Sequence, residues 1–137
     1  MADTIELEVA TPERELVREM VSDLQVPGKN GYMGILPGHA PLLGLLGIGV
    51  LQYVSVSDGK KHYLSIHGGF MEVLDDHVRV LADVAERAEE IDVPRAKVAL
   101  QRAVEEGLNP ALGVDPGAAL LAMERAQARL DTADKHK

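Results

Sequence analysis

The sequence predicts an α+β protein in which an N-terminal antiparallel β-sandwich is followed by a C-terminal antiparallel α-helical hairpin. Up to about residue 85, short apolar–polar alternations are separated by glycine and aspartate turns, which is typical of β-sandwiches and flattened barrels. From residue 91 onward the apolar spacing becomes helical. Composition changes at the same place, because all four aromatic residues and the whole excess of acidic charge lie within residues 1–90. We therefore expect two domains, at residues 1–85 and 91–137.

The first expected strand runs from Thr4 to Val9, where apolar and polar residues alternate. The next stretch, Thr11–Leu24, fits two structures. Its apolar residues have helical spacing behind a threonine-proline start, and they also alternate as in a strand. The local pattern by itself slightly favours a helix.

The remaining strands are predicted by alternation and by turn chemistry. Pro27–Gly31 is an expected turn. Gly31–Leu43, with three glycines and two prolines, is an expected ordered loop that includes a short strand. Asp58-Gly59 predicts a hairpin turn, and Gly68-Gly69 is expected to break the strand that contains it. The strands are expected at Met33–Leu36, Ile48–Ser57, Lys61–Ile66, Phe70–Leu74 and His77–Asp83.

Two helices are predicted by the same signal, an aspartate cap followed by a proline in the first turn. The first starts at Asp92 and is expected to end near Glu106, where Gly107 stops it. The second starts at Asp115. Both apolar stripes consist largely of alanine: Ala96, Ala99, Leu100 and Ala103 on the first helix, and Ala119, Ala122, Met123, Ala126, Leu130 and Ala133 on the second. Because alanine buries little area, we expect a weakly held hairpin that can move.

Composition narrows the function. The chain has no cysteine, which excludes disulfides and thiolate metal sites. No apolar run reaches the ~18 residues of a membrane span, so we expect no direct membrane insertion. The net charge of −8, without a basic stripe, argues against nucleic acid. The histidines lack metal-ligand spacing, and neither a catalytic constellation nor a Walker-type phosphate loop is found, so we predict no metal, no catalytic residue and no enzyme activity.

Three motifs resemble one known family. Gly31–Leu43 contains Gly-x-x-Gly-Ile-Leu-Pro-Gly-His-Ala-Pro-Leu, Gly68–Val73 reads Gly-Gly-Phe-Met-Glu-Val, and Val80–Ala88 reads Val-Leu-Ala-Asp-Val-Ala-Glu-Arg-Ala. In this order and spacing they resemble the epsilon subunit of bacterial F-type ATP synthases, which is equivalent to the mitochondrial delta subunit, over essentially the whole chain. The resemblance implies two short strands within Thr11–Leu24, and we adopt these over the helix, because tertiary context often overrides local propensity.

The resemblance implies a non-catalytic subunit of the rotor's central stalk. Its implied partners are the gamma subunit, the c-ring and, through an extended hairpin, the alpha/beta catalytic head. The expected location is the cytoplasmic face of the bacterial inner membrane, as a peripheral protein. The implied role is to couple proton translocation to ATP synthesis. The hairpin would inhibit ATP hydrolysis when extended and permit rotation when folded against the sandwich.

The loop Gly31–Leu43 is, by resemblance, at the end of the sandwich that meets the rotor ring. A simpler interpretation of His39 is an imidazole that is hydrogen-bonded by neighbouring backbone. The expected partner contacts are Tyr32, Met33, Pro37, His39, Ala40, Pro41 and Leu42.

The arginines of the second domain differ in their neighbours. Arg95 and Arg102 each have an acidic residue three or four positions away, which allows an ion pair on the helix surface. Arg125 and Arg129 have none, so an anion or an acid from elsewhere in the chain could balance them. Exposed, solvated arginines are the alternative.

Ile91–Ala96 resembles the Ile/Leu-Asp-x-x-Arg-Ala motif by which some bacterial epsilon subunits bind ATP. No resident cofactor is implied, and ATP would be a regulatory ligand. A role of Asp92 as a plain helix cap fits the sequence equally well. The implied nucleotide contacts are Glu86, Ile91, Asp92, Arg95, Ala96, Arg102, Arg125 and Arg129.

Two other functions remain open on the sequence. One is a purely structural β-sandwich adaptor with a static hairpin that binds no ligand. The other is a nucleotide sensor that acts alone, with the hairpin as its binding module.

Overall fold

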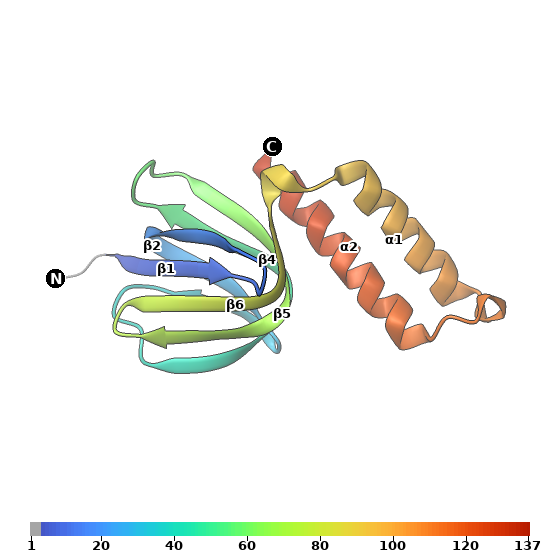
Figure 1. Cartoon of the computed structure of the whole chain (residues 1–137), viewed down its shortest axis with the longest axis horizontal. Coiled ribbons are helices and arrows are strands. Elements are labelled where there is room, and N and C mark those ends of the chain that lie inside the picture. Colours follow the sequence, from blue (N-terminus) through green and yellow to red (C-terminus); the bar gives the residue numbers. More distant parts are fainter. Residues whose placement is uncertain (1–3) are drawn as a thin grey trace.

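The structure, a computed structural model, describes residues 4–137 and contains six strands followed by a pair of helices (Figure 1). The strands are β1 (Ile5–Ala10), β2 (Glu15–Gly28), β3 (Gly31–Ile35), β4 (Leu42–Ser55), β5 (Lys61–Leu74) and β6 (His77–Arg87). β3 and β4 leave a shorter irregular loop than expected, Leu36–Pro41, because β4 already begins at Leu42.

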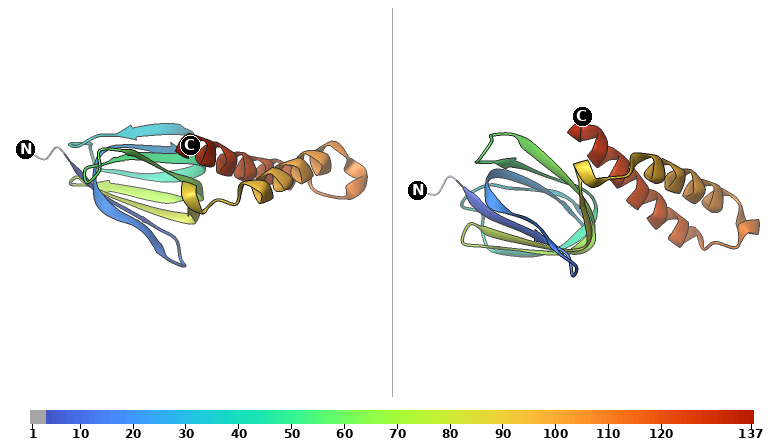
Figure 2. Two further views of the ribbon diagram at one scale, coloured as in Figure 1. Left: turned by 90° about the horizontal axis from the view of Figure 1, so that it is seen from above. Right: turned by 45° about the horizontal axis from the view of Figure 1, so that its top comes forward.

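The six strands form one sheet that closes on itself. Their order is β1-β6-β5-β4-β2-β3, and β1 also pairs with β2, which gives a flattened barrel (Figure 2). All of these pairings are antiparallel apart from that of β1 with β6, the first and last strands, which are parallel. The predicted combination of a β-sandwich and a helical hairpin is confirmed.

The hydrophobic core lies between the strands. In β1, the side chains of Ile5, Leu7 and Val9 point inward and are almost completely buried, while the residues between them are partly exposed. Every member of the core cluster falls between Ile5 and Ala85. The sandwich therefore has a core of its own, which does not depend on side chains from the helices.

The stretch Thr11–Leu24 contributes to one strand, so the prediction of two short strands is wrong, whereas the choice of strand over helix is confirmed. β2 is continuous from Glu15 to Gly28 and changes partner along its length, from β1 in its first half to β3 and β4 in its second. A register shift between Val21 and Asp23 allows the strand to bend there instead of ending.

The expected break at Gly68-Gly69 is also wrong. β5 continues through both glycines, although their φ angles are positive, 74° and 115°. A Cβ atom at Gly69 would lie 2.8 Å from Ala82 Cα and would also collide with the carbonyl oxygen of Leu81. The glycines therefore permit β6 to approach closely, and they do not terminate the strand.

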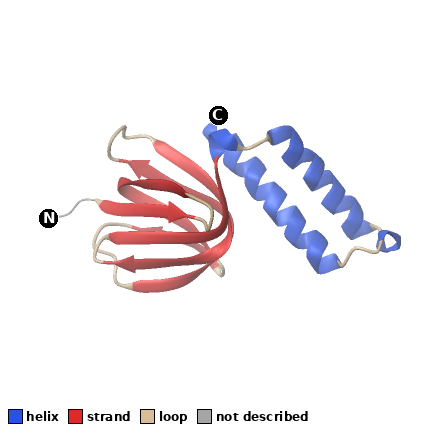
Figure 3. Ribbon diagram, viewed as in Figure 1, coloured by secondary structure: helices blue, strands red, loops and turns tan. Residues whose placement is uncertain are grey.

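Two helices follow the sandwich (Figure 3). After the 3-10 turn η1 (Ala88–Glu90), α1 covers Val93–Leu108, and the 3-10 turn η2 (Pro110–Leu112) leads into α2 (Pro116–His136). Both expected caps are confirmed: Asp92 accepts a hydrogen bond from the Arg95 N–H at 3.1 Å, and Asp115 accepts one from the Ala118 N–H at 3.0 Å. The expected stop at Gly107 is wrong, since α1 includes it and ends one residue later.

Helix α2 packs on β4 and β5, and α1 packs on α2 (Figures 1 and 3). Ala96 and Ala103 of α1 and Ala119 and Ala126 of α2 are buried, as the alanine stripes predict, whereas Ala99 is exposed. Ala128 and Thr132 are buried on the opposite side of α2, which faces the sheet. Small side chains on both sides of α2 limit the apolar area that holds the hairpin, so its docking contributes little stability compared with the sandwich core.

We expect Gly69→Ala to lower the free energy of unfolding by about 2 kcal/mol or more, because it combines a positive φ with a backbone collision. Urea denaturation measures the change. Gly34→Ala is the matched control, since a Cβ atom at Gly34 meets no heavy atom within 4 Å and its φ lies outside the left-handed region. Equal effects of the two substitutions would contradict this account of the β5–β6 contact.

Candidate functional site

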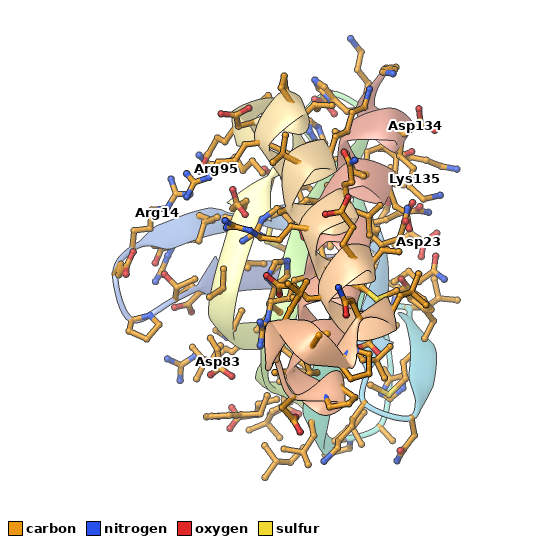
Figure 4. All side chains as sticks on the ribbon, turned by 90° about the vertical axis from the view of Figure 1, so that its right-hand side faces the viewer. Arg14, Asp23, Asp83, Arg95, Asp134 and Lys135 are labelled. Carbon is orange, nitrogen blue, oxygen red and sulfur yellow. The ribbon has the colours of Figure 1, made fainter. Side chains whose placement is uncertain are left out.

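A cavity of about 560 Å³ lies where the end of the sandwich meets the base of the hairpin. It is lined by residues of the β1–β2 turn, β6, η1 and both helices: Thr11, Glu13, Arg14, Asp83, Val84, Ala85, Glu86, Glu90, Asp92, Arg95, Ala96, Ala99 and Arg129. Figure 4 looks onto this side of the molecule and shows Arg14 and Arg95 near each other at one side of the helix pair. Residues separated by more than a hundred positions thus share one site.

Glu90 anchors the segment that joins sandwich and hairpin. Arg14 reaches it from the β1–β2 turn with two hydrogen bonds, of 2.5 and 3.3 Å, and Arg87 adds a third of 2.9 Å. The hydrogen bond from Arg14 is the main cause that lowers the pKa of the Glu90 carboxyl. Arg87 also donates to the carbonyl oxygen of Leu16. This clamp ties down the chain immediately before Ile91, where it leaves the sandwich.

A second charged contact joins α2 to the sandwich. Arg129 Nε lies 2.5 Å from Glu86 Oε1 on β6, and both side chains are about 70% shielded from solvent, with exposed fractions of 30% and 28%. Glu86 therefore balances the charge of Arg129, for which α2 has no acidic residue three or four positions away. Because the pair is partly buried, it contributes more to docking than an exposed ion pair would.

Asp92 and Arg95 do not form the ion pair that their spacing allows. The Asp92 carboxylate accepts the backbone N–H of Arg95 as the cap of α1. The Arg95 guanidinium lines the cavity, and within residues 4–137 it has no carboxylate within 4.0 Å. Arg95 is thus the cavity's arginine that is available to an added anion.

The predicted nucleotide contacts are only partly brought together. Those that line the cavity are Glu86, Asp92, Arg95, Ala96 and Arg129. Ile91 is buried beside it without lining it, and Arg125 lies outside the lining. Arg102 is also remote: its side chain is 80% exposed and lies 3.8 Å from Glu106, as the helical spacing predicts.

Sequence reasoning missed the contribution of the β1–β2 turn. Thr11, Glu13 and Arg14 line the cavity, and Arg14 forms an ion pair with a residue 76 positions away. No local pattern marks them. The lining holds five carboxylates and three guanidinium groups. The binding of a polyphosphate in the cavity would therefore depend on close contacts with arginines, because the overall charge of the lining does not attract an anion.

The loop Leu36–Pro41 forms a second candidate surface. The His39 ring nitrogen Nδ1 lies 2.7 Å from the Ala40 carbonyl oxygen, so the imidazole is bonded by neighbouring backbone, as one interpretation predicts. The N–H of Gly38 donates to Asp76 at 2.6 Å, which ties the loop to the β5–β6 turn.

The predicted partner contacts divide into exposed and inward-facing residues. Tyr32, Ala40 and Pro41 are exposed, and Pro37 and His39 are half-buried. Met33 and Leu42 pack against the core and offer little surface. A set of exposed apolar side chains close by in the sheet and its turns was not among the predicted contacts: Leu36, Leu43, Leu45, Phe70 and Leu74. Leu45 and Phe70 lie directly opposite each other on β4 and β5.

Residues 4–137 meet the requirements of neither a metal site nor a membrane-spanning helix. Within that range, no group of His, Asp and Glu side chains is placed to hold a metal ion. No described helix is long and apolar enough to cross a membrane.

Comparisons with known proteins extend over almost the entire chain. Residues 4–88 match the family described as the β-sandwich domain of the ATP synthase delta/epsilon chain. A relative from Solibacter usitatus named ATP synthase epsilon chain is 70% identical over 135 residues, which is 98% of this chain and 99% of the relative. One from Syntrophomonas wolfei, with the same name, is 44% identical over 132 residues, or 96% of each chain.

Two solved structures share the fold. A chain in the OSCP/F1/c-ring structure of the Euglena gracilis mitochondrial ATP synthase aligns with a TM-score of 0.83 and 28% identity, over 97% of this chain and 82% of that chain. A chain in the central stalk and c-ring of the Tetrahymena thermophila mitochondrial enzyme aligns with a TM-score of 0.58 and 15% identity, over 96% and 95%, which is a likeness of fold alone. On the sandwich match and the full-length relatives together, the chain belongs to the ATP synthase epsilon chain family.

Proposed function

We propose that the protein is a non-catalytic central-stalk subunit of an F-type ATP synthase, in which a mobile C-terminal hairpin inhibits ATP hydrolysis. The observation that carries the proposal is the unequal packing of its two parts. The sandwich has a complete core, whereas the hairpin is held by alanine, threonine and one partly buried ion pair. An element held so weakly can leave its docked position at small cost.

The proposed partners of the sandwich are the gamma subunit and the c-ring, and the protein would lie at the cytoplasmic face of the bacterial inner membrane as a peripheral subunit. The Euglena relative comes from an F1/c-ring assembly, which supports this placement. The exposed apolar side chains around Leu43 and Phe70, together with the rigid loop Leu36–Pro41, offer a surface suited to such partners. Rotation transmitted through this contact would couple proton translocation to ATP synthesis.

The hairpin would act as a regulator with two positions. Extended toward the alpha/beta catalytic head, it would block ATP hydrolysis; docked on β4 and β5, it would permit rotation. The clamp of Arg14 and Arg87 on Glu90 keeps the sandwich side of the joint fixed, so the movement would begin at Ile91. A pivot held this firmly makes the hairpin move as one body.

ATP is the proposed regulatory ligand of the cavity between sandwich and hairpin. Arg95 has no carboxylate partner among the described residues, and Arg129 can exchange Glu86 for a phosphate. Because sandwich and hairpin both line the cavity, ATP would bind the docked form better than the extended form and shift the population toward docking.

Removal of residues 91–137 should raise ATP hydrolysis by the assembled complex, because the inhibitory element is lost while the sandwich core remains intact. A coupling free energy of about 1 kcal/mol or more corresponds to an increase of about fivefold or more. Steady-state hydrolysis by complexes reconstituted with the full chain and the shortened chain measures it. An unchanged rate would support the structural adaptor with a static hairpin instead.

Arg95→Gln should weaken ATP binding by the full chain about tenfold or more, because a charge-assisted hydrogen bond to phosphate is lost. Arg102→Gln on the same helix is the matched control and should have little effect, since its side chain is 80% exposed and outside the cavity. Arg125→Ala should likewise cost less than Arg95→Gln. Isothermal titration with Mg-ATP measures all three, and equal losses at Arg95 and Arg102 would place the ligand elsewhere.

A further inference from the structure

His67 is a buried imidazole beneath the hairpin. β5 alternates its side chains, so that Leu64 and Ile66 point into the core while Ser65 and His67 point to the opposite face, on which α2 packs. Ser65 has no exposed surface and His67 is only 5% exposed, although neither belongs to the core cluster. Their burial therefore depends on the docked hairpin.

The surroundings of His67 suit a neutral ring. One ring nitrogen, Nε2, lies 2.8 Å from Ser65 Oγ, while Nδ1 is buried and has no hydrogen-bond partner among residues 4–137. A protonated ring would have to donate from both nitrogens, and the Nδ1 donor has no acceptor. A buried donor without an acceptor carries the full cost of its lost hydration.

The charged groups that face His67 are mostly cationic. From α2, Arg129 and Arg125 both lower its pKa, and from β6 only Glu86 raises it. Glu86 already neutralises Arg129. The residues of β4 that lie opposite this part of β5, such as Ile48 and Val50, carry no charge. Burial is the largest cause, and with the two arginines it lowers the pKa of His67 from 6.5 to about 4.

We propose that His67 is a proton-sensitive latch: the neutral imidazole allows α2 to dock on β4 and β5, and protonation of the ring drives the hairpin off the sandwich. The proposal rests on the mobility of the hairpin stated under the proposed function and adds the group that controls it. Undocking would expose the His67 ring to water and move both arginines of α2 away from it. The ring therefore binds a proton more tightly in the undocked form than in the docked form.

The direction of the effect follows from the two pKa values. The docked hairpin has its full stability above pH 6.5, the pKa of the His67 ring in the undocked form. Its stability falls as the pH decreases toward about 4, the pKa of the ring in the docked form. By proton linkage, the undocking equilibrium constant should rise about fourfold at pH 6 and about thirtyfold at pH 5, relative to pH 8.

The chain has no cysteine, so two can be introduced for spectroscopic labels on the full-length protein. Glu72 on β5 and Leu120 on α2 are both exposed and lie outside the helix–sheet contact, so Glu72→Cys with Leu120→Cys reports the distance between sandwich and hairpin. Pulsed electron–electron spin resonance measures the docked and undocked fractions between pH 8 and pH 5. We expect the undocked fraction to grow on acidification as given above.

His67→Gln should abolish this growth, because glutamine does not titrate and can still hydrogen-bond Ser65. His62→Gln on the same strand is the matched control and should leave the pH response unchanged, since the His62 side chain is 39% exposed and pairs with Asp58 in the turn before β5. An equal pH response in the His67→Gln protein would overturn the latch.

A direct titration by NMR of the His67 ring in the unsubstituted chain gives an independent test. A pKa far below that of a free histidine supports the latch, and an ordinary value with the hairpin docked overturns it.

The mobility of the hairpin and the latch at His67 can fail separately. A hairpin that stays docked at every pH, and whose removal leaves hydrolysis unchanged, overturns mobility itself. A rise in hydrolysis on removal, with no pH response of docking, overturns only the latch.

Discussion

The closed strand core is the feature on which the rest of the molecule depends. Because alternating side chains from all six strands fill it, the sandwich needs no help from the helices to fold. The core of the sandwich consequently does not depend on the hairpin. The packing of the hairpin relies on small side chains such as Ala128 and Thr132, and weak packing of this kind suits the proposed regulatory movement.

One charged residue connects the ion pair of the hairpin, the cavity and His67. Arg129 forms an ion pair with Glu86, lines the cavity and contributes to the positive field on His67. A nucleotide phosphate and a proton would therefore act on the same contact in opposite directions. Anion binding would favour the docked hairpin, while protonation of His67 would oppose it. Both proposed effects would act where α2 packs on β4 and β5.

The joint between the two parts is held to the sandwich by charged contacts of one residue. Glu90 is held to the sandwich by Arg14 and Arg87, while two residues later the cap at Asp92 begins a helix that packs on α2. In the proposed movement, this arrangement would restrict the motion to the short connection and preserve the hairpin as a unit. It also explains why the β1–β2 turn lines the cavity, since Arg14 must reach the connection.

Alternation, turn residues and helix caps are local signals, so the two-part fold, both helix starts and most strands could be predicted from the residues alone. The sequence could not decide where β2 changes partner or whether Gly68-Gly69 ends β5, because these outcomes depend on the strands that lie alongside. Five of the implied nucleotide contacts meet in the cavity, but Arg14 enters it only through the closure of the barrel. His67 likewise looked like any strand histidine, because its burial, its unpaired nitrogen and its two arginine neighbours exist only once α2 is docked.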